Sequence, residues 1–315
     1  MISSLQLAKL CGVSQGTVDR ALHDRPGIGA ATKARILAVA AEHGYTPNPV
    51  ARELMSGRSA LLGVIVPAVN SVFFMDLVNE VKRACDPVGL RPLITPVADA
   101  EEFLAVLGEF AARRFRGAIV VPPAERLRLP DGLTCTLPVA TLLSACRDRR
   151  TRLVAPDEVA TGRAAVDYLT GLGHERIVHV TYRRSARAIR DRRQGYREAM
   201  RERGLRAAIC PGADPEQLGE WLRRRRPTAL FCHNDWLALA AMRTLTAAGL
   251  RVPEDISVLG VDDSPTFTSL FPNITTLHYP AAEVAAAAVA WIAAGTEPPP
   301  IPVLDVVERE TVRGV

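Results

Sequence analysis

The stretch TALFCHNDWLALAAMRTLTAAGLRVPEDISVLGVDD, residues 228–263, decides the fold. It contains two short, nearly continuous apolar runs, at 228–235 and 256–263, and between them an amphipathic segment that ends at Gly249. Continuous apolar runs are typical of strands buried on both faces, and a glycine after helical spacing is typical of a helix C-terminus. The stretch is therefore predicted to be a strand–helix–strand unit with two parallel strands in one sheet.

The same alternation of apolar runs and amphipathic segments continues through the chain from Leu61 onward. The other apolar runs are LLGVIVP (61–67), RPLITPV (91–97), GAIVVPP (117–123), LPVATLL (137–143), RIVHVTY (176–182) and ITTLHYP (274–280), and further segments with helical spacing are 73–89, 101–115, 160–173 and 190–204. These units are more numerous than one ordinary sheet holds. We therefore expect two similar α/β lobes with parallel sheets.

Composition excludes several classes of protein. The 315 residues have 48% hydrophobic content, no apolar run long enough to span a membrane, and no N-terminal signal for export, so we expect a cytoplasmic protein. The net charge of +5 permits an anionic partner. Six scattered cysteines form no CxxC or Cys/His cluster, so we expect reduced thiols and neither disulfides, a metal site nor a cofactor.

The first 45 residues have helical spacing and contain no clear strand. Ser4 is predicted to cap a helix over about residues 5–11, and Gly12 permits a tight turn before a second helix that Ser14 caps. In the first helix the expected inward side chains are Leu5 and Ala8, and the pattern leaves Leu7 open. In the second helix they are Val18, Ala21 and Leu22, and in a third helix Ile36, Leu37, Val39 and Ala40. This spacing favours a helix-turn-helix, and the alternative is a helical cap on an α/β enzyme.

Several sequence motifs, in order along the chain, resemble the LacI-type (lactose repressor/galactose repressor) family of bacterial transcriptional regulators. The motifs are AKLCGVSQGTVDRAL (8–22), EHGYTPNPVARELMSG (42–57), LGVIVPAVNSVFF (62–74), D-E-x-x-x-G (157–162), GHERI (173–177), RRQGY (192–196), FCHND (231–235), GLRVPEDISVLGVDD (249–263) and ITTLHYP (274–280). The resemblance implies an N-terminal all-α helix-turn-helix domain at 1–45, a hinge helix or linker at 46–60, and a two-lobed, periplasmic-binding-protein-like body at 61–315. In that body the first lobe would hold about 61–156 plus 281–300, and the second about 157–280 plus 301–315.

The resemblance also implies a set of DNA contacts. Ser14 and Thr17 would contact phosphates or bases, Gln15 and Gly16 would form the base-reading pair, and Arg20 would enter the major groove. Glycine has no side chain with which to read a base, so we expect specificity to shift to Gln15, Arg20 or the backbone. Asp19, on the same face, either orients a nearby donor, accepts from a cytosine amino group, or repels phosphate.

The segment PNPVARELMSG (47–57) is predicted to form the hinge helix. Asn48 suits its N-cap, Pro49 its first position, and Gly57 follows its end. Two turns are too short to be stable alone, so the helix should form when it pairs with its partner on DNA. By the resemblance, Leu54 is the apolar wedge in the minor groove, with Ala51 beside it; the alternative for Leu54 is a core leucine.

Polar residues follow the predicted strands where a parallel α/β lobe binds ligands, as at Asn234 and Asp235 and at Asp262 and Asp263. By the resemblance, the effector site holds Phe73, Phe74, Asp157, Arg192, Asn234, Asp262 and Tyr279. Aromatic rings with amide, carboxylate and guanidinium groups suit a sugar-like ligand. Helix capping or contact between the lobes is the alternative role for each residue, Asn234 above all, and Arg193 is the alternative to Arg192.

Two arginine-rich segments allow different interpretations. Arginines 223–226 precede Pro227 and are predicted to be a solvated helix end, where cations are favourable. The segment 182–206 is denser, and it leaves open a phosphorylated or carboxylated effector.

These features predict a homodimeric DNA-binding regulator, a repressor, that binds a pseudo-palindromic operator in double-stranded DNA under the control of a small ligand. The alternative is an α/β enzyme that acts on a carbohydrate. No nucleophile elbow, phosphate-binding loop or metalloprotease motif supports that alternative, and the histidines lack the spacing of metal ligands. We therefore expect no catalytic residues and no membrane partner.

Overall fold

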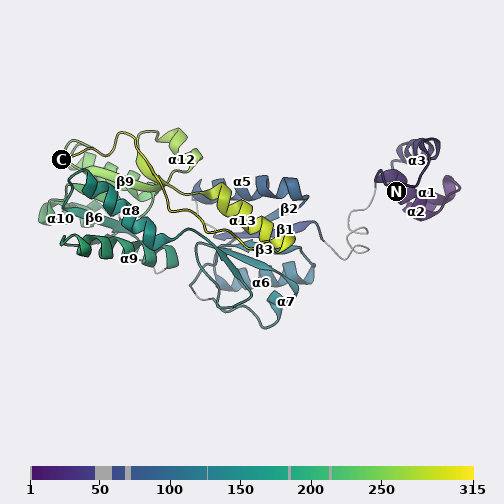
Figure 1. Ribbon diagram of the computed structural model, residues 1–315, viewed down its shortest axis with the longest axis horizontal. Coiled ribbons are helices and arrows are strands. Elements are labelled where there is room, and N and C mark those ends of the chain that lie inside the picture. The colour runs from purple at the N-terminus through teal and green to yellow at the C-terminus, as the bar shows by residue number, and fades with distance from the viewer. Residues whose placement is uncertain (1, 47–58, 68–71, 126, 184–185, 213–214) are drawn as a thin grey trace. The chain divides into compact units, whose positions relative to one another are not determined.

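The structure is a computed structural model, and it describes residues 2–46, 59–67, 72–125, 127–183, 186–212 and 215–315 (Figure 1). By contacts between residues, the chain divides into a unit of Met1–Ser59 and a larger unit of Ala60–Val315. Within the described ranges no helix is both long enough and apolar enough to cross a membrane.

In its described part, residues 2–46, the N-terminal unit is a bundle of three helices, α1 (Ser4–Leu10), α2 (Gln15–Leu22) and α3 (Ala30–Glu42). Its small core is formed by Leu7, Ala8, Cys11, Val18, Ala21, Ile36 and Ala40. The prediction that Leu5 and Leu37 belong to this core is wrong, because their side chains are 55% and 41% exposed. The inward face of α1 is formed by Leu7 and Ala8 and that of α3 by Ile36 and Ala40, and the phase of each helix turns Leu5 and Leu37 outward.

Capping residues fix the ends of α1 and α2. Ser3, and not Ser4 as the sequence predicted, caps α1: Ser3 accepts from the Gln6 backbone N–H, and the Gln6 side chain accepts from the Ser3 N–H. The predicted cap of α2 is confirmed, since Ser14 Oγ accepts from Thr17 N at 3.2 Å. Gly12 has a φ of +60°, which only glycine adopts readily, so the tight turn between α1 and α2 requires it.

The first lobe of the larger unit is a five-stranded parallel sheet in the order β2-β1-β3-β4-β5. Its strands are β1 (Leu61–Pro67), β2 (Arg91–Val97), β3 (Gly117–Val120), β4 (Val139–Leu142) and β5 (Arg152–Val154). Helices α5 (Val72–Cys85) and α13 (Ala281–Ala294) cover one face, and α6 (Ala100–Ala112) and α7 (Leu133–Thr136) cover the other (Figure 1). The short 3-10 helix η1 (Asp86–Val88) follows α5.

Strand β2 differs from its expectation. The sequence predicted a strand buried on both faces, but β2 is an edge strand, and of its residues only Val97 is buried. The side chains of Leu93 and Ile94 in β2 are 44% and 43% exposed, and that of Met75 in α5 is 62% exposed. The apolar run therefore faces outward from this chain.

The second lobe is a six-stranded sheet in the order β11-β10-β9-β8-β6-β7. Its strands are β6 (Ile177–Thr181), β7 (Ala208–Pro211), β8 (Ala229–Cys232), β9 (Ser257–Asp262), β10 (Thr275–His278) and β11 (Val306–Val307), and only β11 pairs antiparallel. Its helices are α8 (Glu158–Gly171), α9 (Arg187–Glu202), α10 (Pro215–Arg225), α11 (Asp235–Ala247) and α12 (Pro265–Leu270). The exposed arginines at the end of α10 confirm the predicted helix terminus.

The chain passes between the lobes at β5 and again around α13. It leaves the first sheet after β5 to form α8, returns from β10 to place α13 on the first lobe, and ends in the second lobe after β11. The carboxyl ends of strands in both lobes are thereby brought to a shared boundary.

Helices α8 and α9 cross at a very short distance because each carries a glycine at the crossing. A Cβ at Gly195 would lie 1.9 Å from the carbonyl oxygen of Val159, and a Cβ at Gly162 would lie 2.2 Å from that of Arg192. Neither position can hold a larger residue unless the helices separate.

We predict that Gly195→Ala lowers the free energy of unfolding by about 3 kcal/mol, because backbone on the facing helix must move. The measurement is urea denaturation of the full chain. The matched control is Gly108→Ala in α6, where a Cβ would meet no atom within 4 Å, and this change should stabilise by about 0.5–1 kcal/mol. A Gly195→Ala protein as stable as the wild type would show that the helices are not held at this distance.

Candidate DNA-binding helix and effector cavity

Helix α2 presents a polar surface to solvent. Ser14, Gln15, Gly16 and Arg20 are exposed, and Thr17 is half-buried. The Ser14 and Thr17 hydroxyls lie 2.9 Å apart, and Gln15 Nε2 donates to Ser4 Oγ of α1 at 2.8 Å. Ser4 thus orients the Gln15 side chain.

The two charged residues of this face, Asp19 and Arg20, differ in whether their side chains have a partner. Asp19 accepts from Arg25 Nη1 at 2.8 Å, and its other oxygen lies 3.1 Å from His23 Nδ1. Of the three roles considered for Asp19, orienting a neighbouring donor is the one this geometry favours. Arg20 makes no side-chain hydrogen bond or ion pair with any residue that the structure describes, so its guanidinium is available to a partner. Ala51 and Leu54 lie outside the described residues.

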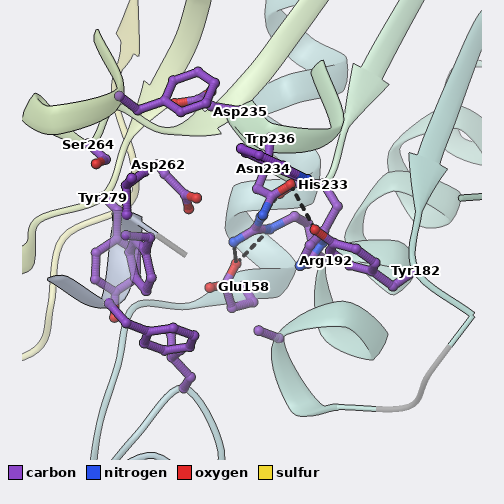
Figure 2. A pocket seen from close by; sticks show the side chains of 16 residues that line it. Glu158, Tyr182, Arg192, His233, Asn234, Asp235, Trp236, Asp262, Ser264 and Tyr279 are labelled. Atoms are coloured by element: carbon purple, nitrogen blue, oxygen red, sulfur yellow. Dashed lines mark hydrogen bonds and ion pairs between the residues drawn. The ribbon is translucent and has the colours of Figure 1, made fainter. Parts of the chain in front are cut away.

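A cavity of about 480 Å³ lies at the boundary between the two lobes of the larger unit (Figure 2). Val72, Phe73, Phe74 and Leu143 contribute its wall from the first lobe. The second lobe contributes Glu158, Tyr182, Ala188, Arg192, His233, Asn234, Asp235, Trp236, Asp262, Ser264 and Phe267. Tyr279, which follows β10, completes the wall.

Six of the seven predicted effector-site residues line this cavity, and Asp157 does not. The six are Phe73, Phe74, Arg192, Asn234, Asp262 and Tyr279. Asp157 is the N-cap of α8 and accepts from Val159 N and Ala160 N at 2.9 and 3.1 Å. Its neighbour Glu158, within the same D-E-x-x-x-G motif, faces the cavity instead.

Arg192 is held in place by its own protein. Its Nε and Nη2 donate to Glu158 Oε2 at 2.8 and 2.6 Å, and its Nη1 donates to the backbone carbonyl of His233 (Figure 2). Both side chains of this ion pair are buried. Arg193, the alternative, donates to the Tyr182 carbonyl and does not line the cavity.

Asn234 caps a helix and also lines the cavity. It is the N-cap of α11, since Oδ1 accepts from Leu237 N at 3.0 Å, and the same oxygen accepts from the Tyr182 hydroxyl at 3.2 Å. Its amide nitrogen makes no hydrogen bond with the described residues, and the side chain lines the cavity, so the nitrogen can donate to a ligand.

Aromatic rings form one side of the cavity. Phe73 packs edge-on against both Tyr279 and Phe74, with ring centroids 5.1 and 5.5 Å apart. Burial, with smaller contributions from Glu158 and Asp262, raises the pKa of the Tyr279 hydroxyl, so this group stays neutral. Sequence reasoning missed three aromatic residues of the cavity, Tyr182, Trp236 and Phe267. Their positions in the sequence could have indicated them, because Tyr182 follows β6, Trp236 follows β8 and Phe267 follows the paired aspartates after β9.

Asp235 fixes the shape of the loop after β9. Its two carboxylate oxygens accept from Thr276 Oγ1 at 2.6 Å and from Asp263 N at 2.9 Å. Gly260 leaves room for this carboxylate, because a Cβ there would lie 2.0 Å from Oδ1. The loop has positive φ at Asp262 (127°) and Asp263 (51°), which non-glycine residues adopt only when held.

Burial raises the pKa of two carboxyl groups here. That of Asp235 rises to about 7, chiefly because the group is buried, and its hydrogen bonds oppose the change only in part. The pKa of Asp262 rises well above its ordinary value, first through burial and then through the charge of Asp235.

Side chains also link the two lobes directly. Asp76 of α5 accepts from the Ser264 hydroxyl, from Thr266 N at 3.1 Å and from Thr266 Oγ1 at 2.6 Å, so a residue of the first lobe caps α12 of the second. Elsewhere Arg190 of α9 binds both oxygens of Glu125 at 2.7 Å. Among the described side chains no group of three His, Cys, Asp or Glu residues is placed to hold a metal ion.

Two family descriptions match this chain. "Bacterial regulatory proteins, lacI family" matches residues 6–48, and "Periplasmic binding protein-like domain" matches residues 166–314. The chain is 27% identical to the HTH-type transcriptional regulator DegA of Bacillus subtilis, over 89% of this chain and 87% of that protein. It is 29% identical to the ribose operon repressor of Escherichia coli, over 92% and 91% of the two chains.

Solved structures share the fold over the whole chain. The Lac repressor dimer bound to operator and the anti-inducer ONPF has a TM-score of 0.83 at 24% identity, with 98% of each chain covered. The regulator CelR in complex with cellobiose has a TM-score of 0.67 at 25% identity, with 99% and 100% covered. A helix-turn-helix unit joined to a two-lobed ligand-binding body defines a class of transcription regulators. The chain belongs to the LacI-type family of bacterial transcriptional regulators.

We predict that Asp235→Asn changes how stability depends on pH. A folded-state pKa of about 7 means that the folded protein binds the proton more tightly than the unfolded chain, so Asp235 stabilises below about pH 4 and loses this contribution as pH rises through 7. The free energy of unfolding of the wild type should therefore fall, relative to Asp235→Asn, between about pH 4 and pH 8. Urea denaturation across this range measures it.

The control for that series is Asp131→Asn, at an exposed carboxylate on the first lobe. A difference between wild type and Asp235→Asn that is constant across the pH range would contradict the assignment.

We also predict that Asp19→Ser tightens binding to DNA of random sequence. The change removes a negative charge from the exposed face of α2 and releases Arg25, so the slope of log affinity against log salt should become steeper by about one unit. Fluorescence anisotropy with a random duplex gives the slope. Glu42→Gln, at the end of α3, removes one charge from elsewhere in the unit, and an equal effect of that change would show that only net charge matters.

Proposed function

We propose that this protein is a sequence-specific repressor whose affinity for operator DNA is controlled by a small polar ligand in the cavity between its lobes. One observation carries the proposal: a separate helix-turn-helix unit with an exposed polar α2 precedes a body with a ligand-sized cavity built from two lobes. Relatives that are named as repressors, and the CelR complex with cellobiose, support repression and a sugar-like ligand.

DNA reading is assigned to the N-terminal part of α2. Arg20 has a free guanidinium, and Gln15 is oriented by Ser4, so these two side chains can reach base edges in the major groove. Gly16 is exposed and would bring the backbone close to the DNA at its position. Ser14 and Thr17, at the helix start, suit phosphate contacts. Leu54 and Ala51 are assigned to the minor groove on the family resemblance alone.

Control of DNA binding would follow from differential affinity of the ligand for two lobe arrangements. A ligand in the cavity touches both lobes, and the direct links at Asp76 and Glu125 hold the lobes in one arrangement. A change in that arrangement would move the two N-terminal segments of a dimer and alter their fit to an operator. Whether the ligand releases or tightens operator binding depends on which arrangement it favours.

A homodimer is the form we propose to bind DNA, on a pseudo-palindromic site. The apolar side chains that β2 and α5 expose, Leu93, Ile94 and Met75, supply a surface for a second copy. Two α2 helices would then read half-sites about one helical turn apart. Because the relatives are regulators and the proposed partner is chromosomal DNA, we place the protein in the cytoplasm and assign it no enzymatic activity.

The experiment selects preferred duplexes from a random palindromic library with the full chain and then titrates the best duplex by fluorescence anisotropy. We expect specific binding that weakens by orders of magnitude between about 50 and 200 mM salt. Arg20→Ala should weaken specific binding by about 1–3 kcal/mol and relax one position of the site, and Leu54→Ala should weaken specific binding. The control, Arg113→Ala at the C-cap of α6, removes the same charge from the body and should have no effect.

Enrichment of no sequence would contradict the proposal, as would equal effects of Arg20→Ala and Arg113→Ala. Turnover of a sugar by the pure protein would favour the alternative of an α/β enzyme.

A further inference from the structure

Among the described residues that line the cavity, no cation is free to bind an anionic ligand. Arg192 is the one arginine or lysine among them, and all three of its nitrogens already donate to Glu158 or to the His233 carbonyl. Three further arginines of α9 have partners of their own: Arg187 pairs with Asp191, Arg190 with Glu125, and Arg193 with the Tyr182 carbonyl, although Arg187 Nη1 and Arg193 Nε are left without a hydrogen-bond partner in the described structure. None of these three arginines lines the cavity.

Two carboxylate groups of the cavity, by contrast, have acceptor oxygens without donors. Glu158 Oε1 is buried and has no hydrogen-bond partner within the described part of the chain, and the buried Tyr279 hydroxyl, which can donate or accept, has none either. The side-chain carboxyl of Asp262 likewise accepts no hydrogen bond from the described residues (Figure 2). Asp235 differs, because both of its oxygens are occupied by Thr276 and Asp263.

Such an arrangement calls for a ligand that donates hydrogen bonds. A buried acceptor without a donor destabilises the protein, and a ligand that supplies the donor recovers that free energy on binding. The Glu158 charge is balanced by Arg192, but no cation in the described structure pairs with the Asp262 carboxyl. A positive charge on the ligand would favour the ionised form of this carboxyl against its burial and pair with it.

The aromatic wall has the same preference. Phe73, Phe74, Tyr182, Trp236, Phe267 and Tyr279 all line the cavity. The faces of aromatic rings carry partial negative charge and attract ammonium groups, most strongly where water is excluded.

We propose that the ligand is a small polyol that carries a protonated amine, with its ammonium group bound by Glu158 Oε1 and the Asp262 carboxylate, and that the cavity rejects phosphorylated and carboxylated polyols. The proposal rests on the proposed function, since it names the ligand class of the same cavity. Asn234, through its free amide nitrogen, supplies a donor for one hydroxyl oxygen of such a ligand.

Isothermal titration with matched compounds tests the proposal. The panel is the common 2-amino-2-deoxyhexoses, their parent hexoses, their N-acetyl forms and the hexose 6-phosphates. We expect an amino sugar to bind about tenfold or more tightly than its parent and its N-acetyl form, because acetylation removes the charge, and no heat of binding from the phosphates.

Variants locate the charge that matters. Asp262→Asn keeps the size of the side chain and tolerates positive φ, and it should weaken amino-sugar binding about tenfold while leaving the weaker binding of the parent hexose within about threefold. Glu158→Gln should do the same, and far-ultraviolet circular dichroism checks that it is folded, since Glu158 also holds Arg192. The control is Asp131→Asn, on the first lobe outside the cavity, which should bind like the wild type.

A pH series gives a second readout. Asp262 faces Asp235 from α11, Arg192 from α9 and Glu158 from α8. Amino-sugar affinity should rise as pH rises and Asp262 loses its proton, as long as the ligand amine stays protonated, and this rise should be smaller in Asp262→Asn.

Two results would overturn the inference: tighter binding of a 6-phosphate than of every amine, or no binding of any amine in the panel. Either result leaves the operator titration described above unaffected. That titration needs no ligand and decides separately whether the protein is a DNA-binding regulator.

Discussion

The close crossing of α8 and α9 is the constraint on which the ligand cavity depends. Gly162 and Gly195 let the two backbones touch, and the crossing places Glu158, at the start of α8, against Arg192, in the middle of α9. A buried arginine is tolerable only with a partner, and removal of one member of such a pair typically costs about 3–5 kcal/mol. The same arginine reaches the His233 carbonyl after β8, so one side chain joins three elements of the cavity wall.

Most of the strands could be predicted from sequence because buried parallel strands leave continuous apolar runs. β1 and β2 begin and end at the predicted residues, Leu61–Pro67 and Arg91–Val97. β5, β7 and β11 were missed: β5 and β11 have only three and two residues, and β7 is an edge strand in which only Cys210 is buried. An apolar run cannot distinguish a central strand from an edge strand, and for this reason β2 was taken as buried.

Family resemblance predicted which segments line the cavity, but it could not decide between two adjacent residues of a helix. Asp157 and Glu158 are adjacent carboxylates, and the residue that caps α8 is decided by where the helix begins. Arg192 and Arg193 differ by 100° of helix rotation, which α9 resolves in favour of Arg192. Contacts such as that of Asp76 with Thr266 join residues 190 positions apart, so they leave no local signal in the sequence.

The capping of α12 by Asp76 has a structural consequence of its own. α12 has six residues, and Ser264, at its own N-cap position, donates to Asp76 and caps nothing itself. The helix is therefore complete only while the first lobe is in place, and separation of the lobes would leave its first N–H groups without an acceptor. Because Ser264 and Phe267 also line the cavity, a single short helix and its cap contact both the cavity and the opposite lobe.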